Sequence, residues 1–283
     1  MNINPVKNHR EREKGVLIYP VYSRRSKGLS IGVNLFPDKK SCAFNCPYCE
    51  VFPFSSNAEF SVNHMEDDLR AAITNAHEKK IPVKDICFSG NGEPTLSPDF
   101  KDALKTAECI RAELAPDSKL VIITNGTGLL QERIFSLLME TALNPSVDIW
   151  LKIDAGTSDW YKKMNRCSVP HSKLTEKIKE FISCSPVTIQ TMLCAVNNEP
   201  PPNEETQAWE NFICKLAENS VYSDDGVNCV RGIRKVQLYG KARPAPDDPL
   251  ASELPQKYLE DRAQSLRGRF AEKKITTQTE IYI

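Results

Sequence analysis

The sequence lacks a run of the roughly 18 to 20 apolar residues that a membrane-spanning helix needs. Its N-terminus is polar and has no apolar segment of the kind found in secretory signal peptides. Internal repeats and low-complexity stretches are missing as well. These absences argue against a membrane protein and predict a globular protein of the cytoplasm.

The chain also has no net charge, because 37 lysine and arginine residues balance 37 aspartate and glutamate residues. Proteins dedicated to binding nucleic acids usually carry a basic excess, so the balance argues against that class. Several basic residues do gather around the first predicted strand, but an ordinary solvated surface explains them better than a binding patch. They are Arg24, Arg25, Lys27, Lys39 and Lys40.

Strand-like and helix-like segments alternate along the chain. Six short apolar runs end in glycine or small polar residues, which is typical of buried parallel strands; they are residues 29–36, 85–90, 120–126, 148–156, 188–194 and 235–240. Amphipathic, helix-like segments begin at Met65, Asp99, Gly128, Ser158, His171 and Glu204. This alternation predicts an α/β fold of parallel strand–helix units closed or half-closed into a barrel, with an open doubly wound sheet as the alternative.

Composition divides the chain into three predicted parts. Residues 1–27 form an N-terminal extension, in which the segment GVLIYPVYS is expected to add a strand or hairpin. Residues 28–246 form the core. A proline-rich stretch from Lys241 breaks any regular element, and residues 247–283 are predicted to form a C-terminal appendage of one helix and one strand.

Three of the ten cysteines, Cys42, Cys46 and Cys49, lie within eight positions. In a reducing compartment, clustered cysteines are more often metal ligands than disulfide partners. Three thiolates can hold a four-iron cluster and leave one iron for a small molecule with an amino and a carboxylate group. Zinc is the rival, but a structural zinc site needs a fourth ligand, which would have to come from a distant residue such as His64. The other cysteines are scattered singly, as small buried apolar residues are.

Polar residues follow each predicted strand. In a parallel strand–helix array the loops after the strands converge on one face, where such folds build their sites. The candidates after the second and third strands are Gly90, Gly92, Glu93, Thr124 and Asn125. Those in the fourth, fifth and sixth strands are Lys152, Asp154, Gln190, Gln237 and Tyr239.

The segment Cys42–Cys49, with three and then two residues between cysteines and Tyr48 before the last, resembles the signature of radical S-adenosylmethionine (radical SAM) enzymes. The glycine-rich segment from Gly90 to Pro94 is similar to the family's second loop. The resemblance implies a partial (β/α)6 TIM-like barrel, a [4Fe-4S] cluster and S-adenosylmethionine (SAM). It also implies an oxidoreductase-like activity, in which SAM is cleaved reductively to a 5′-deoxyadenosyl radical that abstracts hydrogen from a substrate.

Site residues follow from the resemblance position by position. It implies that Cys42, Cys46 and Cys49 ligate the cluster, and that the loop with Gly90, Gly92 and Glu93 receives the methionyl end of SAM. The resemblance also implies that four residues at strand ends contact SAM: Thr124, Asn125, Lys152 and Asp154. Gln190 would reach the ribose or the substrate, although a buried, hydrogen-bonded glutamine is an equal alternative. Phe44 and Tyr48 would shield the cluster or approach the adenine.

Within the superfamily, residues 28–246 resemble the small iron–sulfur oxidoreductases that include the wyosine-type tRNA-modifying synthases. This branch implies a one-electron donor of the flavodoxin or ferredoxin type. The tRNA-modifying members have additional cysteines before the main motif, whereas here none precedes Cys42, which argues against tRNA as the substrate. Two other functions stay open: an activase that makes a glycyl radical on a partner, and a non-catalytic binding module stabilised by zinc or an iron–sulfur cluster.

Overall fold

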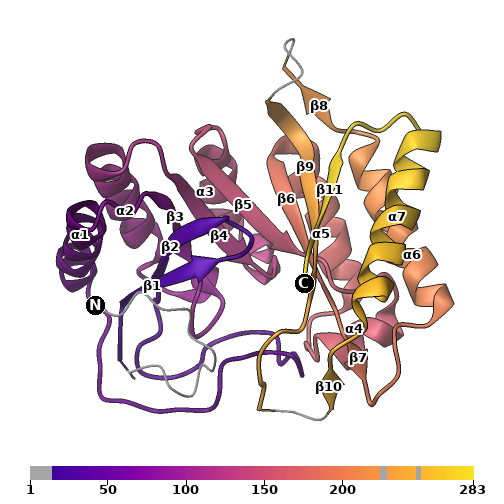
Figure 1. Ribbon diagram of the computed structural model, residues 1–283, viewed down its shortest axis with the longest axis horizontal. Coiled ribbons are helices and arrows are strands. Elements are labelled where there is room, and N and C mark those ends of the chain that lie inside the picture. Colours follow the sequence, from indigo (N-terminus) through magenta and orange to yellow (C-terminus); the bar gives the residue numbers. More distant parts are fainter. Residues whose placement is uncertain (1–14, 224–227, 247–249) are drawn as a thin grey trace. The chain divides into compact units, whose positions relative to one another are not determined.

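The computed structural model describes residues 15–223, 228–246 and 250–283 (Figure 1). The chain divides into two compact units. Unit 1 comprises Met1–Cys42, Glu50–Thr124 and Asn144–Asp148, and unit 2 comprises Ala43–Cys49, Asn125–Leu143 and Ile149–Ile283. Among the described residues, no helix is both long enough and apolar enough to cross a membrane.

Unit 1 is built on strands in the order β1–β2–β3–β4. β1 (Ile18–Ser23) runs antiparallel to β2 (Gly28–Val33), and β3 (Val83–Phe88) and β4 (Lys119–Thr124) continue in parallel. The connections contain α1 (Val62–Glu78), the short 3-10 helix η2 (Pro94–Leu96) and α2 (Phe100–Leu114). Apolar side chains of β3 and β4 pack on these helices, as in the edge-to-face contact of Phe88 with Phe100 at 5.9 Å between ring centroids.

The N-terminal hairpin predicted from the sequence is confirmed, because β1 pairs with β2 along its whole length. Tyr19 of β1 lies opposite Gly32 of β2, and its ring occupies the space that a side chain at position 32 would fill: a Cβ there would lie 2.1 Å from the ring. The Tyr19 hydroxyl donates a hydrogen bond to the backbone oxygen of Ser89, 2.9 Å away. This hairpin therefore supports the loop that follows β3.

Unit 2 contains most of β5 (Val147–Lys152), followed in parallel order by β6 (Pro186–Leu193), β9 (Cys229–Gly240) and β11 (Gln278–Tyr282). β8 (Val221–Tyr222) pairs with β9, and β7 (Ala195–Val196) pairs with β10 (Ala251–Ser252). The helices are η3 (Thr127–Leu130), α3 (Glu132–Ala142), α4 (Ser158–Met164), α5 (His171–Cys184), α6 (Asn203–Ala217) and α7 (Gln256–Glu272).

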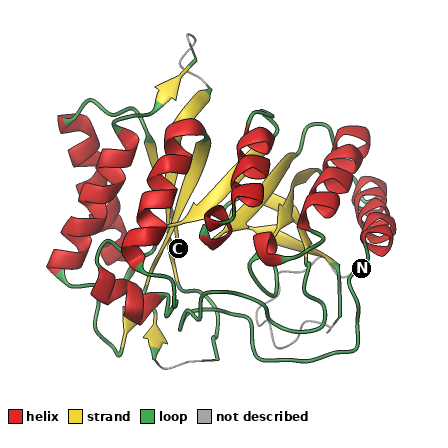
Figure 2. Ribbon diagram, turned by 180° about the vertical axis from the view of Figure 1, so that it is seen from behind, coloured by secondary structure: helices red, strands yellow, loops and turns green. Residues whose placement is uncertain are grey.

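Helices α5, α6 and α7 contact the strands of unit 2, and Figure 2 shows the helices on the near side of these strands. All six predicted strands and all predicted helices are confirmed. The predicted C-terminal helix and strand are α7 and β11, and β11 extends the sheet by pairing with β9. The boundaries of the three predicted parts stay a prediction, and residues 1–14 and 247–249 lie outside the described residues.

Within each unit, parallel strands end at a common edge. In unit 1 this edge carries the segment after β2, the Gly90–Pro94 loop and Thr124 at the end of β4. In unit 2 it carries Lys152 at the end of β5, Asp154 just after it, and Tyr239 near the end of β9. The fold thus places most of the predicted site residues at strand ends.

We predict that Gly156→Ala destabilises the protein. A Cβ at Gly156, in the loop before α4, would lie 2.1 Å from the backbone nitrogen of Trp209 in α6, so the helix would have to move. We expect the free energy of unfolding in urea to fall by about 1–3 kcal/mol, as for other overpacked sites. The control is Gly268→Ala in α7, where a Cβ meets no atom within 4 Å; it should raise stability by up to about 1 kcal/mol. Equal effects of the two substitutions would contradict the packing explanation.

Candidate active site

In unit 1, the chain just before Cys42 is bridged to the glycine-rich loop. The backbone N–H of Ser41 donates to the oxygen of Asn91 at 3.0 Å, and the N–H of Glu93 donates to the oxygen of Ser41 at 2.8 Å. Gly92 makes this approach possible, because a Cβ there would lie 1.9 Å from the Ser41 oxygen. Backbone hydrogen bonds therefore hold the start of the cysteine loop, residues 42–49, next to the predicted SAM-binding loop.

Asn34 fixes the same loop from the end of β2. This buried side chain donates to the backbone oxygen of Val16 at 2.9 Å and accepts from the N–H groups of Phe36 and Asn91 at 3.1 and 3.2 Å. Gly90 has a φ of +152°, a backbone conformation that side chains rarely adopt, and a Cβ there would lie 2.9 Å from the Asn34 Oδ1. No specific sequence pattern indicated Asn34, since a single polar residue after a strand is common.

The predicted residues Glu93 and Thr124 meet in unit 1, and both are buried. Oε1 of Glu93 accepts hydrogen bonds from the hydroxyls of Thr124 and Thr95, at 2.7 and 2.6 Å, and from the Thr95 N–H at 3.3 Å. The carboxylate therefore links the loop after β3 to the end of β4. Its predicted contact with SAM stays a prediction.

In unit 2, the cysteine loop is fastened to the end of α4. The N–H of Asn45 donates to the backbone oxygen of Asn165 at 2.9 Å, and Cys49 N–H donates to the oxygen of Cys46 at 3.1 Å, which closes a turn. Phe44 packs edge-to-face on Tyr161 of α4, with 5.8 Å between ring centroids. The aromatic residue at position 44 thus anchors the loop on a helix.

Asp154, just after β5, is the centre of the hydrogen bonding in unit 2, and its side chain is wholly buried. Its Oδ2 accepts from the Tyr48 hydroxyl at 2.5 Å and from the Asn165 amide at 3.2 Å. Its Oδ1 accepts from the backbone N–H of Met192 at 2.9 Å and lies 3.3 Å from the Lys152 ammonium. One carboxylate therefore joins the cysteine loop, α4, β5 and β6.

Lys152 lies between two aromatic rings. Its ammonium is 5.1 Å from the centroid of Tyr48 and 4.9 Å from that of Tyr239, and it donates a hydrogen bond to the Tyr239 hydroxyl. Burial alone would lower the pKa of Lys152, but Asp154 and Tyr239 outweigh it and raise the pKa above the ordinary value. The site therefore holds a permanent positive charge beside the cysteine loop.

The donor set fits an iron–sulfur cluster. Cys42, Cys46 and Cys49 are free thiols, and each is partly exposed. Burial and the nearby Asp154 carboxylate raise the pKa of the Cys46 thiol to about 12, so it is protonated until a metal replaces the proton. Cys42 belongs to unit 1 and the other two to unit 2. Among the described residues, no three His, Cys, Asp or Glu side chains are already gathered as a metal site.

Gln190 and Gln237 are fully buried and paired, with Nε2 of Gln190 donating to Oε1 of Gln237 at 2.8 Å. The buried, hydrogen-bonded state that the sequence left open for Gln190 is present, and its contact with SAM stays a prediction. Asn125 lies two residues before η3, and its Oδ1 accepts hydrogen bonds from the N–H and hydroxyl of Thr127, the first residue of that helix, at 2.9 and 2.7 Å.

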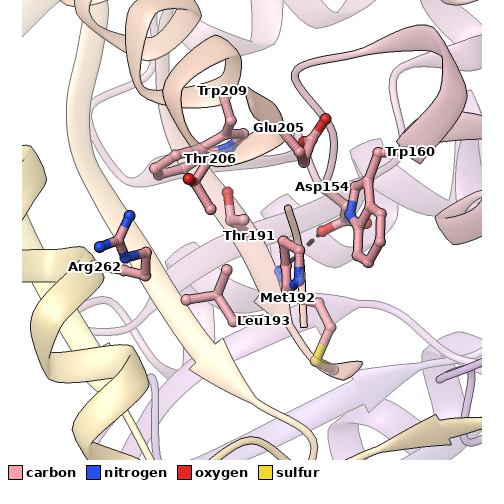
Figure 3. Close-up of a pocket in the computed structure, with 10 residues that line it drawn as sticks. Asp154, Trp160, Thr191, Met192, Leu193, Glu205, Thr206, Trp209 and Arg262 are labelled. Carbon is pink, nitrogen blue, oxygen red and sulfur yellow. Dashed lines mark hydrogen bonds between the residues drawn. The ribbon is translucent and has the colours of Figure 1, made fainter. Parts of the chain in front are cut away.

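A pocket of about 340 Å³, including the part open to solvent, lies next to Asp154 in unit 2 (Figure 3). The Asp154–Met192 hydrogen bond borders it. The surface that lines the pocket is mainly apolar. Its apolar residues include Trp160, Leu193, Pro201 and Trp209, and its polar residues include Thr191, Glu205, Thr206 and Arg262. Of the predicted site residues, Asp154 alone lines this pocket.

Sequence reasoning missed Asn165, the residue that connects the cysteine loop to Asp154. It directly follows α4, and an asparagine at a helix end is common and carries no chemical signal alone.

Comparison with known proteins decides the family. The sequence model of the radical SAM superfamily matches residues 39–199, more than half of the chain. The chain belongs to the radical SAM superfamily. Membership implies a [4Fe-4S] cluster and SAM, in agreement with the sequence prediction.

Curated proteins from bacteria match part of the chain. A UPF0026 protein of Helicobacter pylori is 30% identical over 173 residues, which are 59% of this chain and 50% of that protein. The chain thus spans about half the length of the curated relatives it matches.

Solved radical SAM structures share the fold. A radical SAM methyltransferase from Sphaerobacter thermophilus superposes with a TM-score of 0.63 at 13% identity, covering 93% of this chain and 68% of that one. SuiB of Streptococcus suis bound to S-adenosylmethionine gives a TM-score of 0.62 at 14% identity, covering 86% and 48%. These similarities confirm the predicted fold class, an α/β partial barrel of the radical SAM type.

We predict that Asp154→Ala destabilises the protein by about 3–5 kcal/mol, because it removes four contacts and leaves Lys152, whose side chain is only 14% exposed, without its carboxylate. Urea unfolding measures the change. The control is Asp159→Ala in α4, whose side chain is 90% exposed and pairs only with Lys162 at the surface among the described contacts; we expect a change within about 0.5 kcal/mol. A small effect at Asp154 would contradict its central role.

Proposed function

We propose that the chain holds a [4Fe-4S] cluster through Cys42, Cys46 and Cys49 and uses SAM to abstract hydrogen from an organic substrate. One observation carries the proposal: hydrogen bonds from groups near strand and helix ends hold the cysteine loop, while its thiols stay partly exposed. In unit 1 this support is the backbone bridge from Ser41 to the Gly90–Pro94 loop. In unit 2 it is the contact of Asn45 and Tyr48 with Asn165 and Asp154.

The loop residues have distinct proposed roles. When bound, the cluster and SAM supply a 5′-deoxyadenosyl radical, and the protein supplies placement and exclusion of water. Gly90 and Gly92 allow close approach of the backbone to the methionyl end of SAM, and Glu93 holds that backbone through Thr95 and Thr124.

The remaining predicted SAM contacts are proposed on their position. Lys152 presents a positive charge suited to the SAM carboxylate. Asp154 positions Tyr48, Lys152 and the loop, since protein donors already surround its carboxylate. Asn125 and Gln190 complete the proposed set from η3 and β6.

The branch of the superfamily, the electron donor and the cellular location of the chain are also proposals. The order of motifs over residues 28–246 supports the wyosine-synthase-like branch, with a flavodoxin- or ferredoxin-type electron donor in the cytoplasm. The proposed substrate is an organic molecule with an abstractable hydrogen.

We predict that the protein, purified without oxygen and reconstituted with iron and sulfide, binds about four iron atoms and four sulfides per chain. With dithionite and SAM it should release 5′-deoxyadenosine, measured by chromatography, and Cys46→Ala should release none above background. The matched control is Cys109→Ala, at an exposed cysteine of α2, which should behave as the unaltered protein does. One zinc and no sulfide per chain would refute the enzyme proposal and favour a zinc-binding module.

We predict that Gly92→Ala weakens SAM binding about tenfold or more, equivalent to at least about 1.4 kcal/mol. The added Cβ collides with the Ser41 oxygen and displaces the loop. Equilibrium binding of SAM to the reconstituted protein measures the change, with Gly268→Ala as the control. Unaltered affinity would show that SAM does not depend on the geometry of this loop.

A further inference from the structure

Asn165 follows the last turn of α4 and is 2% exposed. Its side-chain nitrogen Nδ2 lies 3.7 Å from Sγ of Cys46 and 3.2 Å from Oδ2 of Asp154. The distance to sulfur is that of an N–H···S hydrogen bond, since sulfur is larger than oxygen.

The neighbours of Asn165 determine which way its amide points. An ionised carboxylate can only accept hydrogen bonds, so the amide nitrogen, not the amide oxygen, must face Asp154. An amide nitrogen carries two hydrogens. One is directed to Asp154, which leaves the second for Cys46.

The backbone of Asn165 holds this side chain in place. Its N–H donates to the oxygen of Tyr161 at 2.8 Å, and its oxygen accepts from the N–H of Asn45 at 2.9 Å. Asn45 is the residue next to Cys46, so the donor and the sulfur are tied together by a short path through the chain. The N–H···S contact therefore belongs to a constrained arrangement and does not depend on a mobile surface side chain.

We propose that Asn165 is a positioning residue that donates a hydrogen bond to the Cys46 thiolate and thereby raises the reduction potential of the cluster. The inference rests on the proposed function, in which Cys46 is a cluster ligand. A cluster held by Cys46 would take up one electron from a donor outside the chain, and the added negative charge would be shared by the sulfur of Cys46. A hydrogen-bond donor to a ligand sulfur stabilises the reduced form more than the oxidised form.

The arrangement also explains why Asn165 contacts both Asp154 and Cys46. The Asp154 carboxylate contacts the same amide that contacts the sulfur, and a negative charge beside a ligand sulfur opposes the addition of further negative charge. The amide lies between the two groups and offers a hydrogen to each. Replacing it by a second carboxylate would add negative charge at this point.

The test is the midpoint potential of the reconstituted holoprotein without SAM, followed by electron paramagnetic resonance. The variants are Asn165→Ala, which removes the donor, and Asn165→Asp, which keeps the size but replaces the N–H donors with oxygen. We expect the ratio of reduced to oxidised cluster at a fixed potential to fall about tenfold in Asn165→Ala, about 59 mV for one electron. Asn165→Asp should lower this ratio by at least the same factor.

The matched control is Thr157→Ala, which removes the hydroxyl that caps α4 at its other end by accepting from the Trp160 N–H. It should cost stability without shifting the potential. An unchanged potential in both Asn165 variants, or an equal shift in Thr157→Ala, would overturn the inference. Loss of iron and sulfide in both Asn165 variants would also overturn it, because Asn165 would then be needed for cluster binding. If the unaltered protein binds no cluster, the proposed function itself fails.

Discussion

The buried charge of Asp154 is the constraint on which the arrangement of unit 2 depends. An ionised carboxylate without partners costs several kcal/mol to bury, so it is tolerated only where donors surround it. Here the donors come from the cysteine loop, the end of α4 and the backbone of β6, with the ammonium of Lys152 beside them. These segments are distant in sequence. The hydrogen bonds that one carboxylate requires therefore bring them together.

Unit 1 also contains a buried carboxylate that is surrounded by hydrogen-bond donors. Glu93 is buried and takes its donors from the hydroxyls of Thr95 and Thr124. In both units a buried acid is bonded to its own protein neighbours, which fixes the loop that carries it. Within each unit, the loop therefore holds its own thiols or backbone groups in a defined position, as the binding of a cofactor requires.

The sequence was sufficient for the elements and for the family, because both depend on local patterns. Runs such as residues 120–126 alternate with amphipathic helices, and the spacing of Cys42, Cys46 and Cys49 is specific. It was not sufficient for partners that are distant along the chain. The predicted role of Tyr48, to shield the cluster or approach the adenine, stays a prediction, and the sequence did not indicate that its hydroxyl would bond to Asp154, 106 positions away. Asn165 carried no signal at all, since only the folded chain brings it to Cys46.

The hairpin of β1 and β2 has a consequence for the history of the chain. The ring of Tyr19 occupies the place of a side chain at Gly32, and its hydroxyl supports the backbone at Ser89. A large ring at one position and a side chain at the other exclude each other. Among relatives that keep this hairpin, positions 19 and 32 should therefore vary together, so that a larger residue at position 32 accompanies a smaller one at position 19.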